Sequence, residues 1–119
     1  MDFKWITLQV KDMQASLCFY QKIVGLPISA HIEAPGMEIY FLGEAQTKVE
    51  LIYNEANKEV TMARGVSLGF AVENLDEMIS FVEKEGLKIH SGPFSPNPST
   101  RFFYVLDPDG LKVQFVEQR

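Results

Sequence analysis

A pattern that occurs twice is the strongest constraint on how this chain can fold. Residues 48–51 (KVEL) and 112–115 (KVQF) are nearly alike, and so are residues 10–13 (VKDM) and 72–75 (VENL). A Gly-Leu pair also occurs in each half, at 25–26 and 86–87. Because the three patterns come in the same order both times, they indicate one structural unit written twice.

In the first copy, alternating apolar and polar residues over 6–10 predict a strand. Asp12 stands at the N-cap position of a helix from Met13 to about Val24, and Gly25 ends it. Turn-forming residues then separate three more strands. We expect these strands at 27–31, 37–42 and 48–53, although the pattern over 37–42 does not decide which of its side chains face the core.

The second copy repeats this order. A strand is predicted at 67–72, and Asn74 caps a helix that ends at Gly86. Further strands are expected at 87–90, 101–106 and 111–116, with a proline-containing loop at 92–99 and a tight turn at 107–110 (DPDG). Each copy is therefore a β-α-β-β-β module. The polar stretch 54–64 reads as a linker between module 1 (about 1–54) and module 2 (about 65–119).

A unit of this size, with one helix on one small sheet, leaves the other face of the sheet open. We therefore expect the two modules to form a single α+β domain over 1–119, with one curved eight-stranded mixed sheet, the helices outside and a trough within. The two-residue period of a strand predicts which side chains line the trough. They are Trp5, Thr7, Gln9, Lys48, Glu50, Ile52, Ser67, Gly69, Ala71, Lys112, Gln114 and Val116. The repeat pairs Trp5 with Ser67 and Glu50 with Gln114.

Composition narrows the classes of function. The 119 residues are 46% hydrophobic, which suits one globular domain, and the net charge is −5 with no cluster of basic residues. This balance speaks against nucleic acid as a partner. No apolar run approaches the roughly 20 residues of a membrane span, and the first residues do not resemble a signal peptide. We expect a cytoplasmic protein. The single cysteine, Cys18, reads as a small buried thiol in a helix.

Several of these segments resemble the vicinal oxygen chelate superfamily, which includes glyoxalase I, extradiol dioxygenases, fosfomycin-resistance proteins and bleomycin-binding proteins. The resemblance covers essentially the whole chain. It is carried by residues 10–12 (VKD), 16–20 (SLCFY), 25–26 (GL), 49–51 (VEL) and 107–113 (DPDGLKV). It implies a glyoxalase-like fold and a homodimer, as in many relatives. It is much less specific for function, because the superfamily includes isomerases, lyases, oxygenases and drug-binding proteins.

The resemblance also implies four metal-ligand positions, which fall on Trp5, Glu50, Ser67 and Gln114. Here the chain departs from the catalytic pattern. An indole offers only an N–H donor, and a serine hydroxyl is a weak neutral ligand. Glu50 and Gln114 remain, whereas a catalytic divalent ion generally needs three or more protein ligands. We therefore expect neither a metal ion nor another cofactor at this position.

The two histidines, His31 and His90, fall on the second expected strand of each module. This is not where the superfamily keeps its ligands, so both are interpreted as solvated or edge-strand histidines.

The expected pocket residues are Trp5, Thr7, Glu50, Ser67, Phe102, Tyr104 and Gln114. Aromatic rings among them suit a flat or apolar small molecule. Tyr104 precedes the 107–110 turn, as a pocket tyrosine does in the fosfomycin-modifying relatives. The Gln114 amide could donate to the Glu50 carboxylate. Lys48 and Lys112 either lie in water at the sheet edge or reach an anionic ligand.

Three functions remain open. The first is a metal-free protein that binds a small organic molecule. The second is a lactoylglutathione-lyase-like or dioxygenase-like enzyme with an atypical metal site on Glu50 and Gln114. As the candidate catalytic residue, Glu50 could be a general base, since a carboxylate in a water-poor trough holds a proton more tightly. The third is a structural or regulatory module whose trough is filled.

Overall fold

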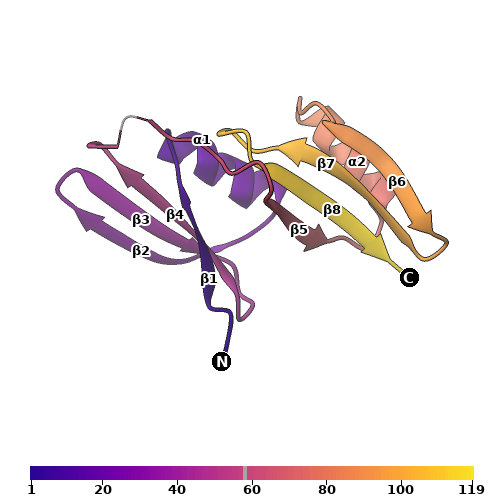
Figure 1. Cartoon of the computed structure of the whole chain (residues 1–119), viewed down its shortest axis with the longest axis horizontal. Helices are drawn as coiled ribbons and strands as arrows, with labels where there is room; N and C mark the ends of the chain where they lie inside the picture. The colour runs from indigo at the N-terminus through magenta and orange to yellow at the C-terminus, as the bar shows by residue number, and fades with distance from the viewer. Residues whose placement is uncertain (58) are drawn as a thin grey trace. The chain divides into compact units, whose positions relative to one another are not determined.

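The computed structural model describes residues 1–57 and 59–119, and this part of the chain forms two compact units, Met1–Thr61 and Met62–Arg119 (Figure 1). Each unit contains one four-stranded sheet with parallel and antiparallel pairs. The α+β class and the duplicated β-α-β-β-β order are confirmed. The eight strands are hydrogen-bonded as two sheets of four, one in each unit.

The first unit contains four strands and one helical segment. The strands are β1 (Trp5–Gln9), β2 (Ile28–Ala34), β3 (Met37–Leu42) and β4 (Lys48–Asn54), arranged in the order β1-β4-β3-β2. Strand β1 pairs with β4 in parallel, whereas β4, β3 and β2 form an antiparallel meander. The predicted second strand, 27–31, extends three residues further than expected, so β2 is a longer edge strand.

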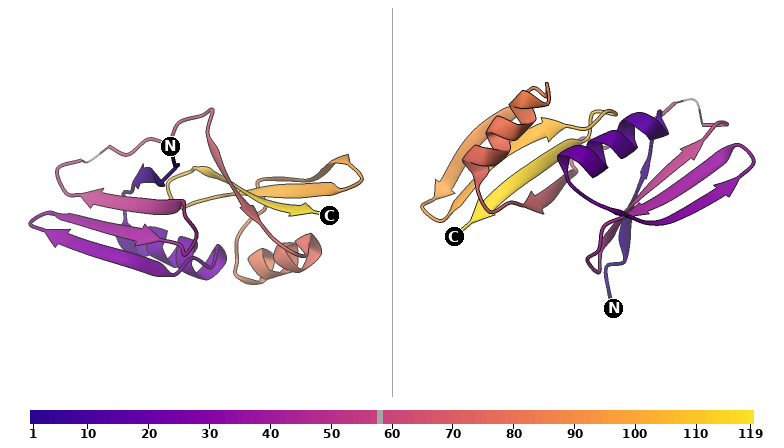
Figure 2. Two further views of the ribbon diagram at one scale, coloured as in Figure 1. Left: turned by 90° about the horizontal axis from the view of Figure 1, so that it is seen from below. Right: turned by 180° about the vertical axis from the view of Figure 1, so that it is seen from behind.

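The predicted helix after Asp12 divides into α1 (Met13–Cys18) and a π-helical turn, η1 (Phe19–Ile23). The Asp12 carboxylate accepts a hydrogen bond from the backbone N–H of Ala15 at 3.2 Å, which confirms the cap. Helix α1 packs on β4, and Figure 2 shows it along one face of its sheet. Cys18 is exposed, so its interpretation as a buried thiol was wrong. The buried face of the helix carries its neighbours Leu17 and Phe19 instead.

The register of the first sheet confirms the predicted division of faces on β1 and β4. Leu8, Val49 and Leu51 are buried on the face that α1 covers. Glu50 lies opposite Thr7 in the parallel pair and opposite Phe41 in the antiparallel pair. Since residues paired across neighbouring strands share a face, Phe41 belongs to the face of Glu50. This pairing supplies the side-chain phase of β3 that its sequence pattern left open.

The second unit has the same plan. Its elements are β5 (Ser67–Ala71), α2 (Leu75–Lys84), β6 (Ser91–Asn97), β7 (Thr100–Leu106) and β8 (Lys112–Gln118), with strand order β5-β8-β7-β6. Phe103, Val105, Val113 and Phe115 are essentially fully buried. Helix α2 packs on β8, on the face opposite Gln114. The predicted Asn74 cap is present, accepting from the Glu77 N–H at 3.0 Å.

The expected strand at 87–90 and loop at 92–99 were wrong. The structure places strand β6 at Ser91–Asn97 and no strand at 87–90. Prolines 93 and 96 led the sequence interpretation toward a loop. However, β6 is the edge strand of its sheet and its pairing with β7 shifts register twice, between Ser91 and Phe94 and between Phe94 and Asn97. Edge strands and bulges tolerate proline, because no ladder partner requires its missing N–H there.

A buried carboxylate joins α2 to the sheet of its unit. Glu117 on β8 is 7% exposed and accepts hydrogen bonds from the Leu75 backbone N–H at 2.8 Å and from Arg119 Nε at 3.0 Å. Leu75 is the first residue of α2, whose early N–H groups have no partner within the helix. The hydrogen bond from Leu75, and then that from Arg119, hold the pKa of Glu117 below its usual value.

This lowered pKa predicts an acid-sensitive contact. A carboxyl whose pKa is lower in the folded state stabilises the fold above its unfolded pKa, and this contribution is lost as the pH falls through the folded value. We expect the free energy of unfolding to decrease as the pH falls below about 4.5, and to decrease less steeply in Glu117→Gln. Urea unfolding between pH 6.5 and 3.5 measures this difference. Equal pH dependence in both proteins would contradict the role given to Glu117, and Glu73→Gln is an exposed control.

The 107–110 turn also forms as predicted. Asp107, 4% exposed, accepts hydrogen bonds from the backbone N–H groups of Asp109 and Leu111, both at 2.9 Å. Gly110 adopts φ 90°, a conformation that glycine provides without strain. The turn therefore fixes where β7 ends and β8 begins. Among the residues that the structure describes, no helix has the length and apolar character needed to span a membrane.

Candidate functional site

Glu50 is the buried polar residue on the open face of the first sheet, the face opposite α1. Its side chain is 8% exposed and its carboxylate accepts a hydrogen bond from the Thr7 hydroxyl on β1. Phe41 lies beside it on β3. The alternation of β4 places Lys48 and Ile52 on the same face. Three neighbouring strands thus present a carboxylate, a hydroxyl and an aromatic ring together.

Trp5 and Phe41 form an aromatic pair further along this face. Their ring centroids are 5.2 Å apart and the planes are inclined at 71°, an edge-to-face arrangement. Trp5 is nevertheless 47% exposed. The two rings border an open hollow of about 380 Å³. Its lining residues are Lys4, Trp5, Ser29, Ala30, Phe41, Gln46 and Lys48.

Two lysines give this hollow a cationic rim. Lys4 and Lys48 both line it, and the Lys48 ammonium donates a hydrogen bond to the Ala45 carbonyl. That bond anchors the long Lys48 side chain beside the rings. An aromatic wall with ammonium groups at its border suits a flat molecule that carries a negative charge.

The second unit presents its own set of predicted site residues on the corresponding face. The Gln114 amide donates to the Tyr104 hydroxyl at 3.4 Å, and the Lys112 ammonium lies 4.2 Å from the centre of the Tyr104 ring. Gly69 lies opposite Gln114, and a β-carbon there would be 3.0 Å from the Gln114 amide oxygen. The glycine therefore allows this amide to approach β5 closely.

Aromatic rings continue along this face of the second sheet. Phe102 contacts Tyr104 edge-to-face, with centroids 5.7 Å apart, and Phe94 lies 5.5 Å from Phe102. Ser67 is exposed and lies opposite Lys112 in the parallel pair. The predicted alternation is thus correct for Ser67, Phe102, Tyr104 and Gln114.

The structure brings the predicted site residues together within each unit. Trp5, Thr7 and Glu50 share one face of the first sheet, and Ser67, Phe102, Tyr104 and Gln114 share one face of the second. The pairings of Trp5 with Ser67 and of Glu50 with Gln114 join the two units and stay predictions.

Sequence reasoning missed Phe41 and Ser29. Phe41 is placed by the register between β3 and β4. Ser29 lies at the register shift of β2, where its hydroxyl donates to the Phe41 carbonyl at 3.0 Å. The pattern over 37–42 predicted a strand that contains Phe41, but which face of the sheet its side chain occupies depends on the pairing with the neighbouring strand.

The resemblance assigned metal ligands to four positions, Trp5, Glu50, Ser67 and Gln114, and the donor groups present there do not fit a catalytic divalent ion. In the first unit, Trp5 supplies no ligand atom, and Glu50, whose carboxylate accepts a hydrogen bond from the Thr7 hydroxyl, is the one charged ligand among the two positions. In the second unit, the Gln114 amide and the Ser67 hydroxyl are neutral oxygen donors. Neither one carboxylate in the first unit nor two neutral oxygens in the second is a good donor set for Zn²⁺ and similar ions, which prefer several imidazole, thiolate and carboxylate ligands.

Comparison with known proteins agrees with this architecture. The family model of the Glyoxalase/Bleomycin resistance protein/Dioxygenase superfamily matches residues 2–115. The lactoylglutathione lyase of Salmonella typhimurium is 26% identical over 121 residues, covering 94% of this chain and 89% of the relative. The trypanothione-dependent glyoxalase I of Leishmania major has a similar structure, with a TM-score of 0.83 at 20% identity, covering 98% of this chain and 86% of the other.

The antibiotic-binding protein TnmS3 from Streptomyces sp. CB03234 shares the fold as well, with a TM-score of 0.80 at 17% identity over 100% of this chain and 97% of the other. The duplicated modules define a glyoxalase-like fold. The chain belongs to the Glyoxalase/Bleomycin resistance protein/Dioxygenase superfamily. Since the similar proteins include both lyases and an antibiotic-binding protein, family membership leaves the activity to the side chains of the site.

Proposed function

We propose that this chain is a small-molecule-binding member of the superfamily that works without a metal ion at the superfamily's usual position, as a cytoplasmic homodimer. The observation that carries the proposal is Trp5. It stands at a position where the metal-dependent relatives hold a ligand, and it lines a hollow instead. The class of ligand that fits this hollow is a flat aromatic anion, which would stack on the rings and pair with Lys4 or Lys48.

Glu50 and Thr7 add polar recognition to this face. The Thr7 hydroxyl donates to one Glu50 oxygen, and a carboxylate has further acceptor positions. These positions suit a hydroxyl or N–H group on a ligand that lies against Phe41. In the second unit, the Gln114 amide and the rings of Phe102 and Tyr104 form a comparable surface.

The second candidate function is a lactoylglutathione-lyase-like or dioxygenase-like enzyme, in which Glu50 is the catalytic carboxylate and Glu50 and Gln114 are an atypical metal site. The name of the Salmonella relative supports this alternative. The chemistry of Trp5 and Ser67 speaks against it, because neither replaces a strong metal ligand.

Trp5 provides a direct test, because it is the single tryptophan of the chain. We expect naphthalene-2-sulfonate, a flat aromatic anion, to change the tryptophan fluorescence saturably. Phe41→Ala should weaken its binding about fivefold, since an aromatic contact contributes roughly 1 kcal/mol. Tyr53→Leu is the matched control, because Tyr53 lies on the opposite face of the same sheet. Unsaturable quenching, or equal binding by Phe41→Ala, would reject the proposed site.

The enzyme alternative has a separate readout. Formation of lactoylglutathione with added Ni²⁺ or Zn²⁺, abolished in Glu50→Gln, would favour the lyase over the binding protein. We expect no such turnover.

The mass of the purified chain in solution, measured by light scattering, tests the proposed homodimer, and we expect twice the mass of one chain.

A further inference from the structure

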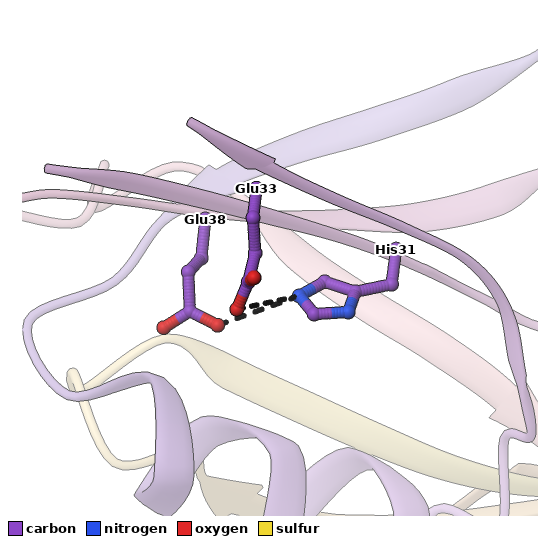
Figure 3. A group of neighbouring side chains, drawn as sticks. All are labelled: His31, Glu33 and Glu38. Atoms are coloured by element: carbon purple, nitrogen blue, oxygen red, sulfur yellow. Dashed lines mark ion pairs between the residues drawn. The ribbon is translucent and has the colours of Figure 1, made fainter. Parts of the chain in front are cut away.

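The opposite face of the first sheet holds a cluster that the proposed function does not use. His31 and Glu33 lie two residues apart on β2, so they point to the same side, and Glu38 lies opposite Glu33 on β3. The His31 Nε2 atom is 3.4 Å from Glu38 Oε2 and 3.8 Å from Glu33 Oε1. Figure 3 shows the three side chains converging below the two strands.

The geometry of these donors approaches that of a metal site. One ligand atom from each side chain can be chosen so that all three lie within 4.8 Å of one another. Ligands bound at about 2.1 Å from an ion in tetrahedral or octahedral geometry are separated by about 3.0–3.4 Å. The separation of His31 and Glu38 already falls at this value. Glu33 is 69% exposed, so its carboxylate is free to rotate the remaining distance.

Two further features favour a cation here. Glu33 and Glu38 are directly cross-strand, and like charges in this position destabilise a sheet unless something compensates them. The His31 ring is stacked on Tyr40, with centroids 4.0 Å apart and planes inclined by 10°. This stacking holds the imidazole in one plane, with Nε2 directed at the carboxylates.

We propose that His31, Glu33 and Glu38 bind a divalent first-row transition ion such as Zn²⁺. One imidazole and two carboxylates form a donor set for these ions rather than for Mg²⁺ or Ca²⁺, which prefer oxygen ligands alone. Three protein ligands leave a coordination position for water. The ion would join β2 to β3 and stabilise this edge hairpin. The site is independent of Glu50 and of the aromatic hollow, which lie on the other face of the sheet.

Isothermal titration of the untagged, chelator-treated chain with ZnCl₂ at pH 7.5 tests the proposal. We expect one ion per chain with a dissociation constant in the micromolar range. His31→Asn and Glu38→Gln should each weaken binding at least tenfold, and Glu33→Gln should weaken it less. His90→Asn is the matched control, because His90 is the only other histidine of the chain. Glu50→Gln should also bind as the unchanged chain does.

A spectroscopic measurement on the unchanged chain avoids any doubt about how the variants fold. Co²⁺ should broaden the imidazole proton resonances of His31 at ratios below one ion per chain, and leave those of His90 sharp. The proposal is overturned if Zn²⁺ produces no binding heat, if His31→Asn binds as tightly as the unchanged chain, or if binding depends on Glu50. Zn²⁺ binding that depends on Glu50 would instead favour the enzyme alternative. The tests of the His31 site and of the aromatic hollow can therefore fail independently of each other.

Discussion

Replacing Phe115 by alanine is expected to lower the free energy of unfolding by about 4 kcal/mol, the largest effect that we predict for this chain. Phe115 is 1% exposed in the middle of β8. It pairs with Phe70 on β5 and with Phe103 on β7, whose ring centroid is 5.4 Å away. Its removal opens a cavity in the core beneath α2, because the neighbouring strands are hydrogen-bonded and cannot close around it.

Urea unfolding followed by circular dichroism measures this loss. Phe94→Ala is the matched control, because Phe94 lies on edge strand β6 and is 45% exposed. We expect that substitution to cost less than about 1 kcal/mol. Unfolding of Phe115→Ala at the same urea concentration as the unchanged chain would show that β8 is not the centre of the core of its unit.

Asp107→Ala should destabilise the chain by about 3 kcal/mol, although it removes only a small side chain. The Asp107 carboxylate accepts two backbone N–H groups, and that of Leu111 is buried. Alanine leaves these donors without their acceptor, which costs more than the net value of the hydrogen bonds themselves. The loss should appear in the unfolding of β7 and β8, since the turn joins these two strands.

The conservative variant Asp107→Asn separates hydrogen bonding from charge. Its side-chain oxygen can still accept both N–H groups, so we expect about half of the stability loss of the alanine variant. Hydrogen exchange of the Leu111 amide provides a local measurement, and the alanine variant should exchange there faster. An alanine variant as stable as the unchanged chain would mean that water replaces the carboxylate without loss.

Much of this fold could be read from local patterns. The caps Asp12 and Asn74 each bond a backbone N–H three residues later, so they act within one turn of their helices. The alternation in β4 and β8 correctly separated Glu50 and Gln114 from the buried residues beside them. Such features depend on neighbours in the sequence, which is why sequence reasoning found them.

Other features depend on strand pairing. Phe41 became part of the candidate site only through its register with Glu50. Strand β6 forms despite its prolines, because it lies at the edge of a sheet. The sequence interpretation also placed Cys18 on the buried side of its helix, whereas its thiol is exposed.

The sequence by itself determined the duplicated β-α-β-β-β module from its repeated segments and the helix caps from the residues at the helix starts. The two-residue period of a strand determined the face on which Trp5 and Glu50 lie. Only the tertiary structure decided that His31 meets Glu38. The register shift between Ile28 and Ala30 places His31 opposite Tyr40, and hence beside the Glu33–Glu38 pair. Register is a relation between two strands, so neither strand's own sequence contains it.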